Sequence, residues 1–132
     1  MIKFTPSEKK YLESMEEARL ATVKDDMPHV KPVSYIFYDN AFFMATDYET
    51  VTYRNISKNP KAGIVTDTYS PGKHKAVCCQ GNVKILESGK EFLEMYQLFF
   101  KKFAWVRNDP WKENEAPILK IVPLTKTSWG LR

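Results

Sequence analysis

The stretch from residue 29 to residue 67 constrains the fold more than any other part of the chain. It begins with two runs of strand-forming residues, separated only by Asp39 and Asn40, a pair typical of tight hairpin turns. A polar, hydroxyl-rich elbow follows, then a short run with helical character, and then another apolar strand. This order predicts a hairpin that passes through an elbow directly into the start of a helix.

The remaining patterns predict a chain in which strands outnumber helices. The expected helices are Thr5–Glu16, Thr50–Lys58 and Ser88–Phe103, and the expected strands are Arg19–Lys24, Val30–Tyr38, Ala41–Ala45, Ala62–Thr66, Lys75–Leu86, Pro117–Leu124 and Lys126–Leu131. Most connections have hairpin length. The fold class we expect is therefore mainly β (α+β): an antiparallel barrel with helices packed outside it, in one domain spanning residues 1–132.

Local signals support several of these elements. Capping-box patterns, Thr5 with Glu8 and Ser88 with Glu91, predict two helix starts, while residues 105–114 are expected to form an irregular loop. Pro32 cannot donate a hydrogen bond to a neighbouring strand, so it predicts an edge or a bulge. Gly81, inside a long strand, predicts a bulge or a barrel corner.

Composition limits the class of protein. The chain has 132 residues and a net charge of +4, with 43% hydrophobic and 27% charged residues, which is typical of a globular protein. Lysines alternate with acids along the chain, so we expect a solvated surface and no nucleic-acid partner. There is no apolar run long enough to cross a membrane and no signal-peptide core, so we expect a cytoplasmic protein with no membrane partner.

Several kinds of catalytic and metal site are not encoded. The glycine-rich nucleotide loops and the G-x-S-x-G elbow of hydrolases are absent. The only histidines are His29 and His74, and no cysteine has zinc-site spacing, so we predict no metal site and no catalytic constellation. Cys78 and Cys79 are adjacent on a predicted strand and point to opposite faces, so they are expected to be free thiols.

The elbow, residues 46–52, is the best candidate for a binding site. A helix begins with backbone N–H groups that lack partners inside the helix, and these favour an anion such as a phosphate. Thr46, Thr50 and Thr52 add hydroxyl groups, although threonines are also ordinary capping residues. Nearby cations, Lys31, Arg54 or Lys75, would complete such a site.

Ordered fragments of the chain resemble the pyridoxamine 5′-phosphate oxidase-like family of FMN-binding split β-barrels. The fragments are ARLATV, PHVKPVSYIF, FFMATDYET, RNISKNPKAGIVTD and VCCQGNVKILES. Together they cover most of the chain between Ala18 and Ser88. The set is more specific than any one fragment, because the order and spacing also match.

The resemblance implies a homodimer that binds FMN across its interface and oxidises or reduces a small molecule, with NAD(P)H as a possible electron donor. It implies these cofactor-binding residues: Lys31, Thr46 and Thr50 toward the flavin, Pro32, Val33 and Ser34 along its ring, Lys75 as a basic residue that opens a strand, and Trp129 near the partner's edge of the site. The flavin would carry the redox chemistry itself.

The sequence departs from this family at the elbow. Oxidase members follow the elbow hydroxyl with two basic residues that bind phosphate, and these positions are Val51 and Thr52 here. Each lost charge-assisted contact is worth about 1.5–3 kcal/mol. Alternatives therefore stay open: a related barrel that uses deazaflavin or haem, or a module that binds flavin or another ligand without catalysis.

Overall fold

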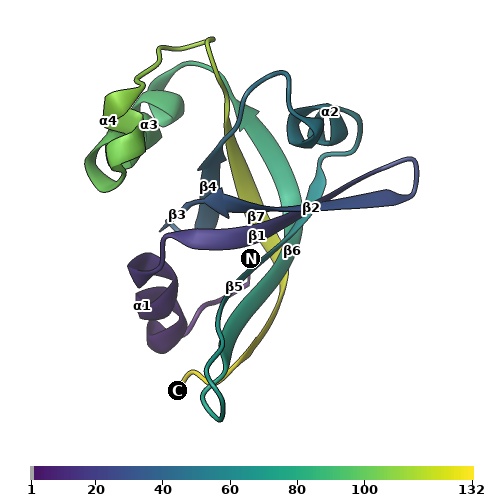
Figure 1. The fold of residues 1–132 in the computed structure, drawn as a ribbon, viewed down its shortest axis with the longest axis vertical. Helices are drawn as coiled ribbons and strands as arrows, with labels where there is room; N and C mark the ends of the chain where they lie inside the picture. The colour runs from purple at the N-terminus through teal and green to yellow at the C-terminus, as the bar shows by residue number, and fades with distance from the viewer. Residues whose placement is uncertain (1) are drawn as a thin grey trace.

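The computed structural model describes residues 2–132, which form one curled antiparallel sheet with helices at its rims (Figure 1). The strands are β1 (Glu17–Lys24), β2 (Met27–Ser34), β3 (Ile36–Tyr38), β4 (Ala41–Ala45), β5 (Lys61–Thr68), β6 (Lys75–Leu86) and β7 (Ile118–Trp129). Their order in the sheet is β2-β1-β5-β6-β7-β4-β3. Because β2 and β3 follow each other in the chain but lie at opposite edges, the sheet curls into a half-closed barrel, as expected.

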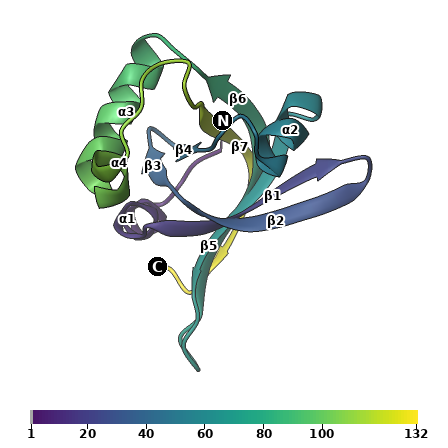
Figure 2. The same ribbon diagram turned by 45° about the horizontal axis from the view of Figure 1, so that its top comes forward.

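Four helices accompany the sheet within residues 2–132. They are α1 (Pro6–Ser14), α2 (Val51–Lys58), α3 (Lys90–Lys102) and α4 (Ala104–Asn108). Helix α2 lies beside the β1–β2 hairpin, while α3 and α4 lie together on the other side of the same end of the molecule (Figure 2). None of the helices in residues 2–132 is long and apolar enough to cross a membrane.

Two apolar clusters hold these parts together. One fills the curl of the sheet and is closed by α1; its fully buried members include Leu12, Tyr35 and Phe42. The other joins α3 and α4 to the sheet through Phe92 and Phe99, which belong to an aromatic stripe along α3. Helix α3 therefore packs its aromatic stripe against this chain's own core.

Several sequence-level features are confirmed. Thr5 and Glu8 form a complete capping box at the start of α1. Asp39 and Asn40 both have positive φ, 51° and 58°, as a tight hairpin turn requires. Pro32 lies on β2, an edge strand.

Gly81 marks a bulge, where the register between β6 and β7 shifts. A Cβ on Gly81 would lie 2.2 Å from the carbonyl oxygen of Val122, so only glycine allows this approach. Pro123 pairs opposite Gly81, and the final strands expected as two are one continuous strand, β7. The prediction of a break was wrong because the bulge accommodates the proline without ending the ladder.

Two further predictions about strands and helices were wrong. Val30–Tyr38 is not one strand, because the chain turns at Tyr35, which is fully buried and donates a hydrogen bond from its hydroxyl to the carbonyl oxygen of Leu12 (2.6 Å). The first helix ends at Ser14 instead of Glu16, since Met15 is already extended. In both places tertiary packing overrides the local pattern.

The predictions around the long helix also need correction. Ser88 does not cap α3; its N-cap is Gly89 with φ 92°, and the backbone N–H of Gly89 donates to Glu113 (2.7 Å). Glu91, the expected partner of Ser88, binds Lys120 instead (2.6 Å). The segment expected to be irregular begins with helix α4.

Candidate functional site

The elbow joins the end of β4 to the start of α2. Thr50 is the N-cap of α2, with an extended backbone, and its Oγ1 accepts a hydrogen bond from the backbone N–H of Tyr53 (3.1 Å). Thr46 lies against it, with 2.8 Å between the two Oγ1 atoms. The structure thus brings together the two elbow threonines that the resemblance assigns to the cofactor.

Both hydroxyl protons are already used within the elbow. Thr50 donates from Oγ1 to the carbonyl oxygen of Asp47 (2.9 Å), so Thr46 must donate to Thr50 in the pair between them. Neither hydroxyl has a proton left for an anion while this arrangement lasts. The two threonines therefore shape the loop, and the donors available to a phosphate must come from elsewhere.

Those donors are the first backbone amides of α2. Val51 and Thr52 stand where the helix offers no internal acceptor, and no partner for their N–H groups is recorded in residues 2–132. The hydroxyl of Thr52 is also buried without a partner, in a residue that is only 1% exposed. A buried hydroxyl without a hydrogen-bond partner lowers the stability of the folded state. Thr52 lies in the first turn of α2, directly after the elbow threonine Thr50 and Val51.

Arg54 supplies a positive charge at this loop. Its guanidinium reaches back over the first turn of α2 and donates to the carbonyl oxygen of Glu49 (2.7 Å). A guanidinium has five N–H groups, so others remain for an anion. Arg54 therefore brings one positive charge to the loop, from a later helical position than the two missing basic residues.

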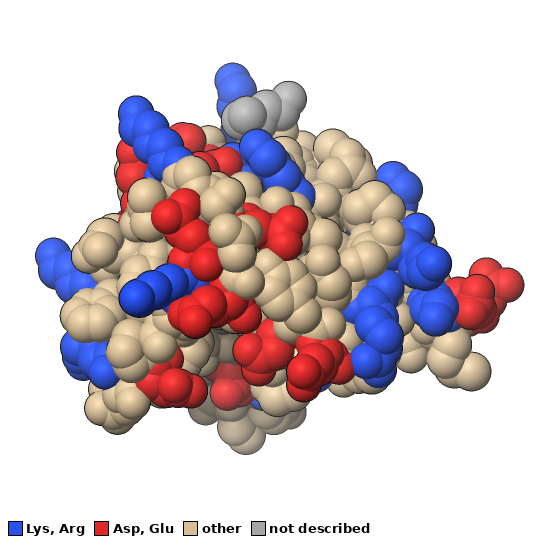
Figure 3. All heavy atoms as spheres, turned by 90° about the horizontal axis from the view of Figure 1, so that it is seen from above, with Lys and Arg blue, Asp and Glu red and all other residues tan. Residues whose placement is uncertain are grey.

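Acidic groups surround the same loop. Asp47 and Glu49 are exposed, and the hydroxyl of Tyr48 donates to Glu87 at the end of β6 (2.6 Å). Burial, the hydrogen bond to Glu87 and its negative charge raise the pKa of Tyr48 to about 12. The view from above shows Asp and Glu side chains across the middle of this end of the molecule (Figure 3).

Strand β2 presents its predicted site residues on two different faces. Lys31 and Val33 pair with Leu20 and Ala18, which are buried, so they share the inner face of the sheet. Helix α2 covers that face nearby, where Asn55 donates to the hydroxyl of Thr22 (3.0 Å). Lys31 has no hydrogen-bond or ion-pair partner in residues 2–132.

Pro32 and Ser34 belong to the opposite, outer face of β2, because side chains alternate along a strand. Pro32 is exposed and Ser34 is half-buried. The four β2 residues thus cannot all turn their side chains toward one ligand, and any shared role must involve the backbone.

Lys75 and Trp129 lie at the far end of the sheet. Lys75 opens β6 and Trp129 pairs with its neighbour Ala76, whereas the elbow adjoins the other end of β6, at Leu86. The strand between them spans eleven residue steps, roughly 35 Å along its path. Within one chain, therefore, neither residue reaches the elbow.

The two histidines differ in their free nitrogens. His74 uses both: Nε2 lies 3.4 Å from Asp67, and Nδ1 accepts from the indole N–H of Trp129 (3.2 Å). His29 on β2 has a buried Nδ1 without a partner. No group of three or more potential metal ligands is found within residues 2–132.

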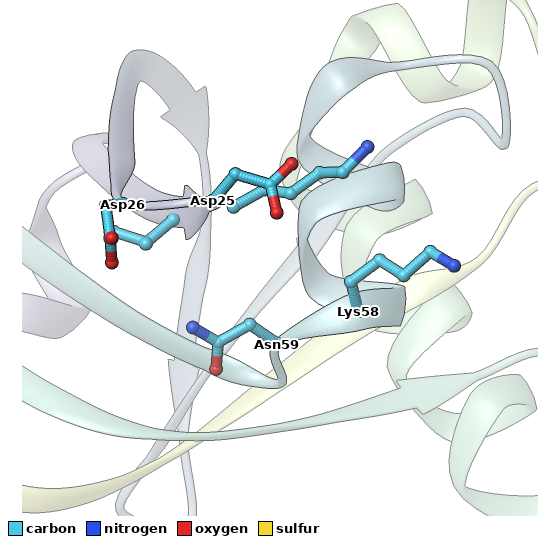
Figure 4. A pocket seen from close by; sticks show the side chains of 6 residues that line it. Asp25, Asp26, Lys58 and Asn59 are labelled. Atoms are coloured by element: carbon cyan, nitrogen blue, oxygen red, sulfur yellow. The ribbon is translucent and has the colours of Figure 1, made fainter.

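Three hollows lie near the elbow, the sheet face or the β1–β2 turn. One, of about 480 Å³, lies between the β1–β2 turn and the end of α2; Asp25, Asp26, Lys58 and Asn59 line it, with side chains that diverge (Figure 4). A second, a groove of about 520 Å³, crosses the outer face of the sheet at Ala21, Gly63, Gln80 and Leu124. Neither of these two contains a predicted site residue.

The third hollow touches the elbow itself. It has a volume of about 160 Å³ and is bounded by Thr46 and Asp47 on one side and by Trp105 and Trp111 on the other. From the sequence alone, the two tryptophans were expected in a loop and no function was predicted for them. The sequence feature that could have indicated this hollow is a pair of tryptophans six residues apart, with Asp109 between them.

Comparison with known proteins defines the family. The family model described as pyridoxamine 5′-phosphate oxidase matches residues 4–125, and the chain belongs to this family. No curated protein matches the sequence significantly.

Solved structures show the same fold at low sequence identity. The haem storage protein HutZ of Vibrio cholerae is 13% identical, with a TM-score of 0.80 over 98% of this chain and 96% of that one. A haem-binding protein of Mycobacterium smegmatis is 16% identical, with a TM-score of 0.80 over 98% of this chain and 56% of that one. An FAD-binding protein of Mesorhizobium loti is 20% identical, with a TM-score of 0.72 over 90% and 87%.

Proposed function

We propose that the protein binds FMN at the elbow and uses it, as a homodimer, to oxidise or reduce a small molecule. The observation that carries the proposal is the start of α2, where the free backbone amides of Val51 and Thr52 stand beside the guanidinium of Arg54. Backbone N–H groups at a helix start and an arginine are the donors that bind phosphate most strongly. Membership of the family supports flavin as the molecule that carries this phosphate.

The residues present fit a phosphate in spite of the lost basic pair. Arg54 replaces one charge, and Lys31, which has no partner within residues 2–132 and lies on the face covered by α2, is our candidate for the second. Asp47 and Glu49 oppose the anion, so we expect weaker binding than two basic residues would give.

A second copy of the chain is part of the proposal. Lys75 and Trp129 lie too far from the elbow of their own chain, so they serve the cofactor only from a partner. The outer face of the sheet offers the groove at Ala21 and Gly63, where small side chains let another surface approach closely. Val30, on the same face of the edge strand, is 63% exposed, which is typical of a surface that is covered in an assembly.

The redox chemistry belongs to the cofactor, since flavin accepts and returns a hydride when bound. The chain's own task is to position it. The α2 amides and Arg54 fix the phosphate, while Lys31 offers a positive charge on the inner face of β2. No side chain needs to act as an acid or base in this chemistry. A reduced nicotinamide is the electron donor we expect.

Haem binding is the second candidate, because two of the structural neighbours are haem proteins. His29 would be the axial ligand, since its Nδ1 has no partner in residues 2–132, whereas both nitrogens of His74 are engaged. Absorbance separates the candidates: bound flavin gives its two visible bands, and bound haem gives a Soret band that His29→Ala would remove.

The elbow can be tested with a charge at the N-cap. Both Thr50→Asp and Thr50→Glu place a negative charge against the phosphate. Aspartate still offers a capping oxygen to α2, whereas glutamate does not. We expect both purified variants to lose FMN, as measured by absorbance and by mass spectrometry of the released cofactor. Ser57→Glu adds the same charge at the other end of α2 and should keep it. A folded Thr50→Asp protein with undiminished FMN would overturn the elbow as the phosphate site.

A further inference from the structure

The hollow between the elbow and the two tryptophans has aromatic walls of fixed orientation. The rings of Trp105 and Trp111 are nearly parallel, at 9°, with their centroids 6.1 Å apart. Trp111 is held from behind by Tyr96 on α3: its ring meets the tyrosine ring edge-on at 4.9 Å, and its backbone N–H donates to the tyrosine hydroxyl (3.0 Å). Trp111 is therefore held in place before any ligand arrives.

The same hollow carries two carboxylates without a counter-ion. Asp47 lines it from the elbow and Asp109 from the segment after α4. Neither carboxylate takes part in an ion pair or accepts a hydrogen bond within residues 2–132. Other acids gather on this end of the molecule (Figure 3), so the local field favours a positive charge.

A buried donor near the hollow is also unsatisfied. The indole Nε1 of Trp111 is buried and has no hydrogen-bond partner. A buried N–H without an acceptor costs free energy. This observation is independent of the two carboxylates and marks the Trp111 side of the hollow as incompletely hydrogen-bonded.

We propose that this hollow binds the ammonium head of a small organic cation. A cation over the face of a tryptophan is attracted by the ring's quadrupole, and tryptophan is the best of the aromatic residues for this. The two carboxylates add charge attraction, and the volume of about 160 Å³ admits a methylated ammonium group with a short hydroxyalkyl arm. An anion such as a phosphate is excluded here by the same carboxylates.

This site is distinct from the phosphate site of the elbow. The anion proposal uses the amides of α2 and Arg54, while the cation proposal uses the side chain of Asp47 and the segment after α4. Neither a flavin nor a second copy of the chain is required for the cation to bind. Loss of flavin binding and loss of cation binding are therefore separate observations.

The test uses choline as the probe and the three indole N–H signals in a nitrogen–proton correlation NMR spectrum as the readout. The chain has three tryptophans, and Trp129 at the far end of the sheet serves as an internal reference. We expect choline to shift the signals of Trp105 and Trp111 saturably while that of Trp129 stays in place. The neutral molecule of the same shape, 3,3-dimethylbutan-1-ol, should bind at least about tenfold more weakly, since it lacks the charge.

Variants identify the groups that bind. Asp109→Asn, at an exposed residue, should weaken choline binding about fivefold or more, and Trp105→Leu should do the same. Glu94→Gln removes an equal charge from an exposed position of α3 outside the hollow and should change the affinity less than about twofold. The proposal fails if choline and its neutral analogue bind equally, if Trp129 shifts as much as the other two, or if Asp109→Asn leaves the affinity unchanged.

Discussion

Buried polar groups at the two ends of the curled sheet differ in whether they have hydrogen-bond partners. Where α1 meets β7, Glu8 is 4% exposed, yet Lys126 (2.6 Å), the backbone N–H of Thr5 (2.8 Å) and the hydroxyl of Ser128 all bind its carboxylate. Where β4 meets α2, the hydroxyl of Thr52 is just as buried and has no partner.

The difference separates a structural polar cluster from a candidate site. A buried charge with all its hydrogen bonds made stabilises one arrangement and leaves nothing for a ligand. A buried donor that is left open, beside free helix amides, costs stability until something binds. We expect substitutions at the α1–β7 end to change the free energy of unfolding, and substitutions at the elbow to change ligand binding.

The largest effect is expected for Glu8→Gln. The change leaves Lys126, which is 19% exposed, without its counter-charge, and we expect a loss of about 3 kcal/mol in the free energy of unfolding measured with urea. Glu94→Gln in the exposed pair with Lys90 is the control and should cost less than about 0.5 kcal/mol. Similar losses in both variants would mean that the buried cluster is not special.

The pH dependence of stability should also report on the carboxylate of Glu8. Burial alone would raise the pKa of Glu8, but hydrogen bonds from Lys126, Ser128 and Thr5 outweigh it and hold the pKa below its ordinary value of 4.5. A carboxylate with a lowered pKa in the folded state stabilises the protein above about pH 4.5, and this contribution is lost as the pH falls through the lowered value. Stability measured from pH 7 to pH 3 should therefore fall less steeply in Glu8→Gln; parallel curves would contradict the assignment.

Thr52→Val should raise the free energy of unfolding, whereas Glu8→Gln lowers it. It removes a buried hydroxyl that has no partner while keeping the shape of the side chain, so we expect about 1 kcal/mol of added stability in the ligand-free protein. Thr22→Val is the matched control, because the hydroxyl of Thr22 accepts from Asn55 and its loss should destabilise. If Thr52→Val destabilises as much as Thr22→Val does, the hydroxyl of Thr52 has a partner after all.

The smallest effect is expected for Tyr48→Phe, since its hydrogen bond to Glu87 is exposed and is worth about 0.5 kcal/mol. The pKa of Tyr48, about 12, is raised above the usual 10, so the contribution is present below pH 10 and disappears as the pH rises toward 12. Ultraviolet titration of the wild type should show a tyrosine ionising near pH 12 that the variant lacks. An unchanged titration would place the raised pKa elsewhere.

Much of the fold could be predicted because its signals are local. The capping box at Thr5, the Asp39-Asn40 turn and the bulge at Gly81 each depend on residues close in sequence or on the absence of a side chain. The local patterns that gave wrong predictions are those where a residue distant in the sequence makes the hydrogen bond instead. Ser88 lost its capping role because Glu113, 25 positions later, binds the start of α3 instead.

The candidate site was predicted less completely. Thr46 and Thr50 do meet, since four residues at a helix start are necessarily close, but Lys75 and Trp129 are separated from them by the length of β6. The usefulness of Arg54 depends on a side chain that folds back over the first helical turn, which no spacing rule predicts.

The amino-acid sequence by itself therefore determined the class of fold, the order of its elements and the place of the elbow, because turn, cap and strand preferences act over a few residues. Only the tertiary structure decided which hydroxyls are already hydrogen-bonded, which donors stay open, and that Trp105, Trp111 and two aspartates surround one hollow. Those outcomes depend on how segments far apart in the chain satisfy or fail to satisfy one another's polar groups, and that is settled when the sheet curls and the loops at its end come together.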